Sequence, residues 1–179
     1  MAIKGRPEPA PGLLRRLDAL ARAAFPAATT ALLMVLVAAP VGVPSALPAV
    51  TLACVFFWSL FRPAAMSPVV CFVLGLLQDL LTFSPLGIGV FTMLVVHGLV
   101  LRLRRLLARQ SFLLVWLSFA GFAAGAALLG FVLQAVLNWR LPAFWPALVQ
   151  LVLCVGFYPA LAAMLTPLHK AMQRAEDLA

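Results

Sequence analysis

Six long apolar runs, separated by short polar segments, constrain the fold of this chain more than any other feature. They cover approximately residues 25–43, 46–61, 67–83, 86–101, 111–137 and 143–168. The chain is 65% hydrophobic and 10% charged, whereas a soluble domain is closer to half apolar and a quarter charged. A helix that crosses a bilayer needs about 20 apolar residues, with about 17 as the lower limit. The first, fifth and sixth runs meet this length by themselves, and flanking residues can extend the others. We therefore expect an all-α integral membrane protein with six transmembrane helices.

A five-span alternative joins the second and third runs into one kinked helix over residues 47–69. Arg62 and Pro63 argue against it, because a charge beside a helix breaker more often marks a surface turn than the middle of a span. The basic residues give an independent test. With six spans and a cytoplasmic N-terminus, twelve of the 13 lysines and arginines lie inside and only Arg140 lies outside, as the positive-inside rule requires. The sequence thus predicts six spans with both termini in the cytoplasm.

The charge distribution also predicts how the chain is divided. We expect a cytoplasmic leader with an amphipathic surface helix over residues 1–24, a transmembrane domain over 25–168 and a short cytoplasmic tail over 169–179. The net charge of +8 does not by itself indicate nucleic acid, because basic residues also set membrane topology and bind anionic headgroups. We expect a bilayer with anionic headgroups as the partner and no nucleic acid.

A cytoplasmic basic patch is predicted after the fourth run. Arg102, Arg105 and Arg109 fall on one face of a helix that leaves the membrane at this point. One interpretation is a topology signal that binds anionic lipid. The other is a docking site for a cytoplasmic partner.

The stretch "LLQDLLTFSPLG" places the carboxylate of Asp79 inside an apolar run. A charged Asp at the centre of a transmembrane helix costs about 2.5–3.5 kcal/mol on the insertion scale. Gly75, Gln78, Asp79 and Thr82 follow a spacing of i, i+3, i+4 and i+7, which places them on one helical face. We therefore expect this face to point into the protein or into a groove. His97 is a poor partner for the carboxylate because it lies deeper toward the cytoplasm, and we expect it to form a neutral hydrogen bond at a helix contact.

The residues after Asp79 predict a tight turn on the outer side. The residue before Pro85 is biased away from helix, and Gly87 can adopt backbone angles that other residues avoid. We expect Asp79 to accept hydrogen bonds from backbone amides of this turn, which would satisfy the carboxylate without a cation. Asp79 would then hold the fold together beside a binding surface.

Polar and small residues also recur on the fifth and sixth runs. Gly121 and Gly125 form a GxxxG pattern, which lets helix backbones approach closely. Two faces carry polar groups at helical spacing: Ala123, Ala127, Gly130, Gln134 and Asn138 on the fifth run, and Gln150, Cys154 and Tyr158 on the sixth. One interpretation is internal packing. The other is a central cavity or a partner-docking groove shared with the third run.

The sequence contains no constellation that indicates catalysis. It has no Ser/His/Asp or Cys/His arrangement, no phosphate-binding loop and no paired carboxylates. The three cysteines have no metal-ligand spacing and are expected to act as small apolar residues. We therefore expect a non-enzyme with no catalytic residues, no metal site and no cofactor.

The segment "GLLQDLLTFSPLGIGVFTMLVVHGLVLRLRR", residues 75–105, resembles the signature of the rod shape-determining protein MreD family. That family shows a G-x-x-x-D-x-x-x-x-x-x-L-G pattern, which Gly75, Asp79, Leu86 and Gly87 match. The motif covers some thirty residues, and the rest of the likeness is one of length and six apolar spans. Phe83, where a small residue often stands, and the leader "PEPAPG" depart from the usual pattern.

The resemblance implies a location and a set of partners. It places the chain in the bacterial cytoplasmic (inner) membrane as a multi-pass, non-enzymatic scaffold of the cell-elongation complex. The implied partners are an MreC-like bitopic membrane protein, a RodA-like glycosyltransferase, a class B penicillin-binding protein and, through the complex, an MreB-like filament. The fold implied is similar to that of the substrate-binding S components of energy-coupling-factor transporters. That likeness leaves one alternative open, namely the substrate-binding membrane subunit of a small-solute or vitamin transporter.

Overall fold

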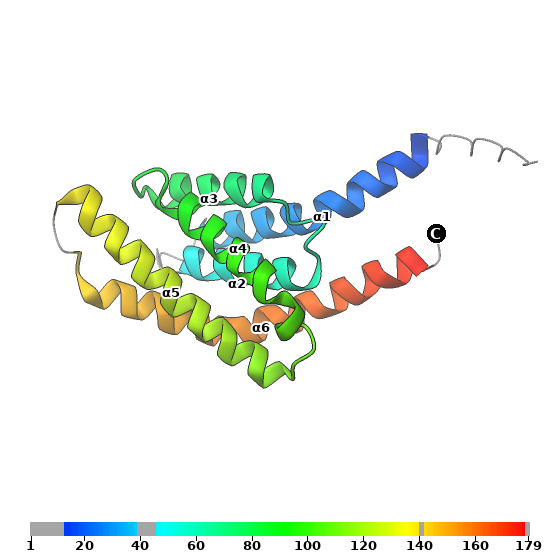
Figure 1. The fold of residues 1–179 in the computed structure, drawn as a ribbon. Coiled ribbons are helices and arrows are strands. Elements are labelled where there is room, and N and C mark those ends of the chain that lie inside the picture. Colours follow the sequence, from blue (N-terminus) through cyan, green and yellow to red (C-terminus); the bar gives the residue numbers. More distant parts are fainter. Residues whose placement is uncertain (1–12, 39–45, 140–141, 178–179) are drawn as a thin grey trace, which may run out of the picture.

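The structure is a computed structural model that describes residues 13–38, 46–139 and 142–177. Over these ranges the chain forms six α-helices and no strand: α1 (Leu13–Ala38), α2 (Ala46–Phe61), α3 (Pro68–Thr82), α4 (Ile88–Leu107), α5 (Phe112–Asn138) and α6 (Phe144–Asp177) (Figure 1). The helices follow the six apolar runs in order. Because α2 ends before Arg62 and α3 begins after it, the kinked helix of the five-span alternative is wrong. The start of the leader, residues 1–12, and Arg140 lie outside the described residues.

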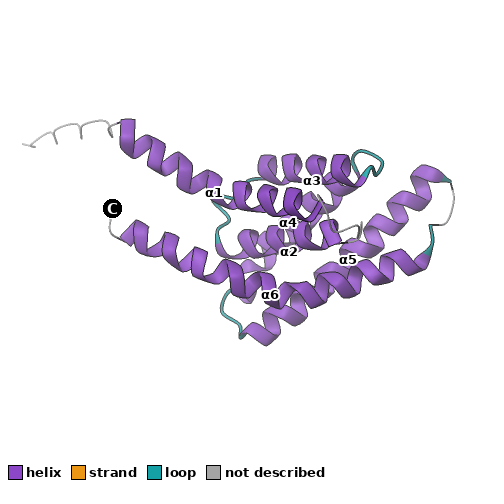
Figure 2. Ribbon diagram, turned by 180° about the vertical axis from the view of Figure 1, so that it is seen from behind, coloured by secondary structure: helices purple, strands orange, loops and turns teal. Residues whose placement is uncertain are grey.

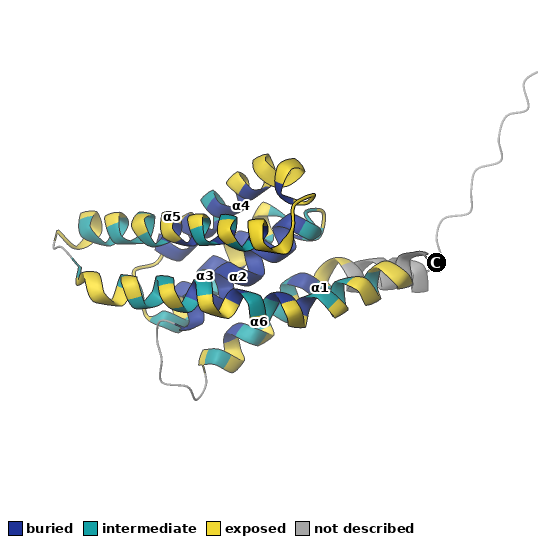
Figure 3. Ribbon diagram, turned by 90° about the horizontal axis from the view of Figure 1, so that it is seen from below, coloured by how far each residue is buried: buried dark blue, intermediate teal, exposed yellow. Residues whose placement is uncertain are grey.

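Helix α2 lies at the centre of the molecule. It contacts each of the other five helices, and all its residues except Pro48 and Phe61 are buried. The sequence explains this position, because a helix that is apolar on every side is stable only when other groups surround it. Figure 3 shows α2 as buried, with the exposed surface carried by the helices around it.

An aromatic cluster joins α2 to α5 and α6. The rings of Phe119 and Tyr158 are stacked with their centroids 4.2 Å apart, and Phe56 meets Phe119 edge to face at 5.1 Å. The indole N–H of Trp116 donates to the carbonyl oxygen of Val155 at 3.0 Å, which adds a polar link between α5 and α6. The sequence places Tyr158 on one face of α6 with Cys154, and the structure buries both.

Helix α5 buries few of its residues although most of them are apolar. Of its 27 residues only four are buried, namely Val115, Phe119, Ala123 and Ala126. Apolar surface of this extent on a helix indicates lipid rather than water. Among the described residues, α5 and Phe144–Arg174 of α6 are the two segments long and apolar enough to cross a membrane. That all six helices span the membrane stays a prediction.

Two boundaries expected from the sequence fall inside continuous helices. Helix α1 runs through residue 24 and α6 runs through residue 168 without interruption. The expected division into a leader, a membrane domain and a tail therefore has no break in helical structure at either point, and the membrane limits of both helices stay predictions.

The ends of the helices are arranged in two groups. The α3–α4 turn, the end of α5 and the start of α6 lie at one end of the molecule, and the end of α4 and the C-terminal end of α6 lie toward the other (Figures 1 and 2). At this second end the Nε–H of Arg104 donates to the carbonyl oxygen of Leu60 at 2.9 Å. A basic side chain of α4 thus satisfies a free carbonyl at the C-terminus of α2, where a helix favours positive charge.

The closest helix contact is between α3 and α4, and it depends on Gly75. A Cβ at this position would lie 2.6 Å from the Cα of Val90, so α4 could not keep its place beside a larger residue. The GxxxG pattern of α5 behaves differently from the expectation. Gly121 and Gly125 have no heavy atom within 4 Å of an added Cβ, because they line an open apolar groove between α4 and α5 of about 720 Å³.

Candidate functional site

The turn between α3 and α4 is built by residues that stop one helix and start the next. Ser67 caps the start of α3, because its hydroxyl accepts a hydrogen bond from the backbone N–H of Val70 at 3.3 Å. Phe83 follows the last residue of α3 and takes the left-handed conformation with φ 51°. Gly87 then precedes α4 with φ 107°, an angle that glycine adopts without steric cost. The predicted turn is therefore present, and Gly87 has the role expected of it.

The carboxylate of Asp79 joins this turn to the end of α3. Oδ2 accepts a hydrogen bond from the N–H of Gly87 at 2.8 Å, and Oδ1 accepts one from the N–H of Gly89 at 2.8 Å. The hydroxyl of Ser84 also donates to Oδ1, at 3.1 Å. The side chain is 1% exposed. We call this group the Asp79 clamp. It confirms the expected hydrogen bonds from the turn, which satisfy the carboxylate oxygens without a cation.

Helix α4 can come close enough to form the clamp because Gly89 has no side chain. A Cβ there would collide with Oδ1 of Asp79 and would lie 2.9 Å from Nε2 of Gln78. Thr82 lies on the same face of α3 as Asp79. Its hydroxyl donates to the carbonyl oxygen of Gln78 at 2.8 Å and is 2.9 Å from the hydroxyl of Ser84. The polar residues of α3 thus face inward together, as their spacing predicted.

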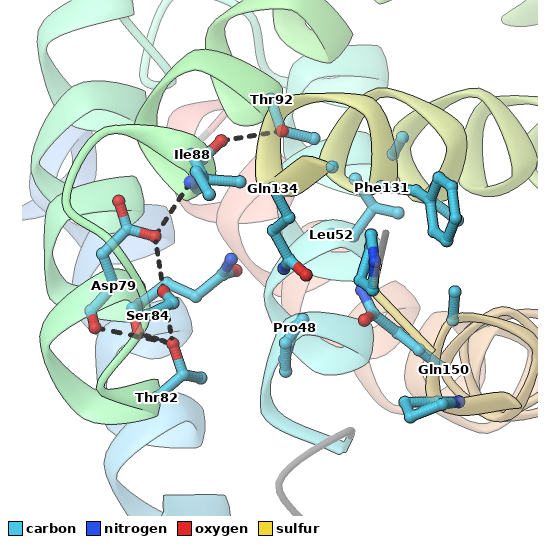
Figure 4. A pocket seen from close by; sticks show the side chains of 18 of the residues that line it. Pro48, Leu52, Asp79, Thr82, Ser84, Ile88, Thr92, Phe131, Gln134 and Gln150 are labelled. Carbon is cyan, nitrogen blue, oxygen red and sulfur yellow. Dashed lines mark hydrogen bonds between the residues drawn. The ribbon is translucent and has the colours of Figure 1, made fainter. Parts of the chain in front are cut away.

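A cavity of about 270 Å³ opens beside the clamp. We call it the polar cavity. Three primary amides line it, Gln78 from α3, Gln134 from α5 and Gln150 from α6. Figure 4 shows Gln134 between Asp79 and Ser84 on one side and Phe131 and Gln150 on the other. The further lining residues are Pro48, Leu52, Thr82, Ile88, Gly89, Thr92, Met93, Ala126, Ala127, Gly130, Pro142, Ala143, Pro146 and Ala147. The polar and small residues of α5 and α6 divide between the two interpretations left open by the sequence. Ala123, Cys154 and Tyr158 are buried in the helix packing, whereas Gln134 and Gln150 line the cavity with Gln78. That the cavity docks a partner stays a prediction.

Gln78 is the most buried of the three amides. Its side chain is 7% exposed, whereas Gln134 and Gln150 are half-buried. The Oε1 of Gln78 forms no hydrogen bond with the described residues.

His97 lies outside this site. Its Nδ1 is 2.8 Å from the hydroxyl oxygen of Ser59 on α2, and both side chains are buried. This confirms that His97 forms a hydrogen bond at a helix contact and does not pair with Asp79. No pattern in the sequence pointed to Ser59, which is separated from His97 by 38 positions.

The three arginines of the predicted basic patch, Arg102, Arg105 and Arg109, are exposed at the end of α4. The neighbouring Arg104 was not among the predicted residues, yet it bonds to α2 as described above. Pro85 is exposed on the α3–α4 turn at the opposite end of the molecule. Within the described ranges no three His, Cys, Asp or Glu side chains gather in one place, so that part of the chain offers no candidate metal cluster.

Ser84 and Gly89 are the clamp residues that the predicted site set does not include. Their hydrogen bonds to Asp79 can be predicted from the sequence only if the register between α3 and α4 is known, because both residues contact Asp79 across the turn. A second glycine two positions after Gly87 is the one signal that a close approach occurs there.

Comparison with known proteins places these observations in a family. A search of curated proteins and a search of solved structures found no significant match to the chain. A family model for the rod shape-determining protein MreD matches residues 23–168. That range includes all six helices in part or in whole, together with the clamp, the polar cavity and the basic patch. The chain belongs to the MreD family of rod shape-determining proteins.

Proposed function

We propose that this protein is a non-enzymatic membrane scaffold of the cell-elongation complex, with six transmembrane helices and both termini in the cytoplasm. The match to the MreD family over residues 23–168 carries the proposal. The topology is supported by the exposed arginines Arg102, Arg105 and Arg109 at the same end as the end of α2, because basic residues favour the cytoplasmic side. The Asp79 clamp and the polar cavity then face the outer half of the membrane.

The partner in this proposal is an MreC-like bitopic membrane protein, and through it a RodA-like glycosyltransferase, a class B penicillin-binding protein and an MreB-like filament. In lipid, helices gain no hydrophobic advantage from pairing and depend on close packing and polar contacts. A scaffold therefore needs a binding surface whose shape is fixed before the partner arrives. The Asp79 clamp supplies this rigidity to the α3–α4 turn.

We place the contact with the MreC-like partner on the tip of that turn. Phe83 is 96% exposed and Leu86 is 65% exposed, and Pro85 between them is also exposed. These apolar side chains extend from a turn held by three hydrogen bonds to Asp79. An apolar group on a rigid support is a suitable anchor for a partner.

Co-purification tests the proposal. The full-length protein is expressed with an affinity tag in a rod-shaped bacterium that lacks its own copy, and cell shape and the retained MreC-like protein are measured. We expect restored rods and recovery of the partner. Leu86→Ser is expected to reduce partner recovery at least fivefold with unchanged protein level, whereas Leu106→Ser, on an exposed site at the opposite end, retains it. If the wild-type chain recovers no partner and cells stay round, the scaffold function is wrong.

The basic patch has a separate role in the proposal, namely to bind anionic headgroups at the cytoplasmic surface. Its arginines are exposed and lie in the last turns of α4 and the short connection to α5. The alternative function, a transporter subunit, receives no support from the family match. No solved structure matched the chain, so the implied likeness of the fold to S components stays an expectation.

A further inference from the structure

The polar cavity has the composition of a site for an uncharged ligand. Among the described residues that line it, none is a lysine, arginine or histidine, and Asp79 is the one ionisable group. Both oxygens of that carboxylate already accept hydrogen bonds from the turn. An anion would therefore meet a negative charge with no cation to offset it, and a cation would compete for oxygens that are already occupied.

The polar groups left to a ligand are the three glutamine amides. Each primary amide offers two donors and one acceptor with two lone pairs. Gln78, Gln134 and Gln150 come from three different helices, and Figure 4 shows the side chains of Gln134 and Gln150 extending from different helices into the same region. Gln78 is the most buried of the three, with 7% of its side chain exposed at the wall of the cavity. Groups arranged in this way suit a molecule that carries several hydrogen-bonding groups around its edge.

The apolar part of the wall and the volume narrow the choice further. Phe131 contributes an aromatic ring, and Leu52 and Ile88 contribute aliphatic surface. Such surfaces pack against the C–H faces of a sugar ring. At about 30 Å³ per water molecule, the 270 Å³ of the cavity corresponds to about nine waters. This volume admits a ring of monosaccharide size and leaves little room for a folded polypeptide segment.

We propose that the polar cavity binds an uncharged, hydroxyl-rich or carboxamide-bearing group of monosaccharide size, held by Gln78, Gln134 and Gln150. The inference rests on the cavity and is independent of the scaffold function. In the proposed topology the cavity lies in the outer half of the membrane, so the group enters from that side.

Saturation-transfer NMR on the full-length protein in nanodiscs tests this with four sugars that share one ring. Glucose and N-acetylglucosamine are the neutral probes, glucuronate is the anionic one and glucosamine is the cationic one. We expect saturable binding of at least one neutral sugar, with both charged sugars at least tenfold weaker. The absence of saturable binding by both neutral sugars, or equal binding of glucuronate, would overturn the proposal.

Variants assign the binding to the cavity. Gln134→Leu and Gln150→Leu are each expected to weaken neutral-sugar binding at least tenfold, whereas Gln173→Leu, on an exposed site near the end of α6, leaves it unchanged. Gln78→Met is expected to weaken binding to the same extent without lowering the thermal midpoint, because the variant no longer buries an unpaired acceptor. Wild-type affinity in all three cavity variants would overturn the assignment.

The same variants distinguish a sugar from a polypeptide. Loss of the MreC-like partner from Gln134→Leu and Gln150→Leu, with no sugar signal from the wild type, would assign the cavity to the partner and overturn the proposal. Retention of the partner together with loss of the sugar signal supports it.

Discussion

Replacing the carboxylate of Asp79 tests the central feature of the α3–α4 hairpin. Asp79→Ala removes every acceptor of the clamp and leaves the N–H groups of Gly87 and Gly89 without their partner. Gly89 is buried and Gly87 is exposed, and a buried donor left unpaired costs about 1–3 kcal/mol, so we expect a loss of about 1–3 kcal/mol in the free energy of unfolding. Ser84→Ala removes one hydroxyl donor and is expected to cost about 0.6 kcal/mol, the average for a side-chain hydrogen bond in a membrane protein.

Asp79→Asn is the more conservative change because it keeps the shape of the side chain and one acceptor oxygen. Its NH₂ replaces the other oxygen and points at a donor of the turn, so one acceptor of the clamp is lost. We therefore expect a smaller loss in the free energy of unfolding than for Asp79→Ala.

Unfolding of the purified protein by SDS in mixed micelles, followed by circular dichroism, measures this series. The matched control is Ser118→Ala, which removes an exposed hydroxyl bonded within its own helix and is expected to change stability by less than about 0.5 kcal/mol. The expected order of stability is Ser118→Ala, Ser84→Ala, Asp79→Asn and then Asp79→Ala. If Asp79→Ala unfolds at the same SDS fraction as Ser118→Ala, the clamp does not hold the hairpin and the reasoning fails.

Three further changes probe the helix contacts by the same SDS titration. Gly75→Ala forces a Cβ against the backbone of α4 and is expected to cost about 1–3 kcal/mol of stability. Its control is Gly98→Ala, which has open space around the added Cβ and is expected to be neutral or slightly stabilising. Equal stability of the two variants would contradict the close approach of α3 and α4. Arg104→Gln removes the bond to the last turn of α2, and we expect a loss of about 0.5–1.5 kcal/mol; an unchanged midpoint would show that water or lipid replaces the bond. Ser59→Ala leaves Nδ1 of His97 without its hydroxyl and is expected to cost about 0.6–1.7 kcal/mol, an expectation that a stabilised variant would refute.

The helices were predictable because their cause is local. In each apolar run a helix satisfies the backbone polar groups by hydrogen bonds within the run itself. Arg62 and Pro63 mark the break between α2 and α3 by local effects alone. The face of α3 that carries Gln78 and Asp79 was predictable for a similar reason, since helical spacing fixes which residues share a side. The hydrogen bond between Asp79 and the turn was predictable because Gly87 lies only eight positions after Asp79.

The GxxxG pattern shows where this reasoning stops. Gly121 and Gly125 fit the spacing for close helix packing, but in the structure they line an open groove. The close approach occurs at Gly75 and Gly89, whose neighbours across the interface are ten or more positions away in the chain. Spacing along one helix identifies small residues but does not say which helix they face.

The sequence by itself determined that this chain is helical and apolar, in which order its six helices follow, and that a carboxylate on α3 needs donors from the turn that follows. These properties depend on residues close together along the chain, where helical geometry fixes the distances. Only the tertiary structure decided that α2 occupies the centre, that Arg104 bonds to its last turn, and that Gln78, Gln134 and Gln150 meet around one cavity. Those contacts depend on how separate helices are rotated and placed against one another, and similar apolar surfaces on every helix leave many arrangements open until the polar groups are paired.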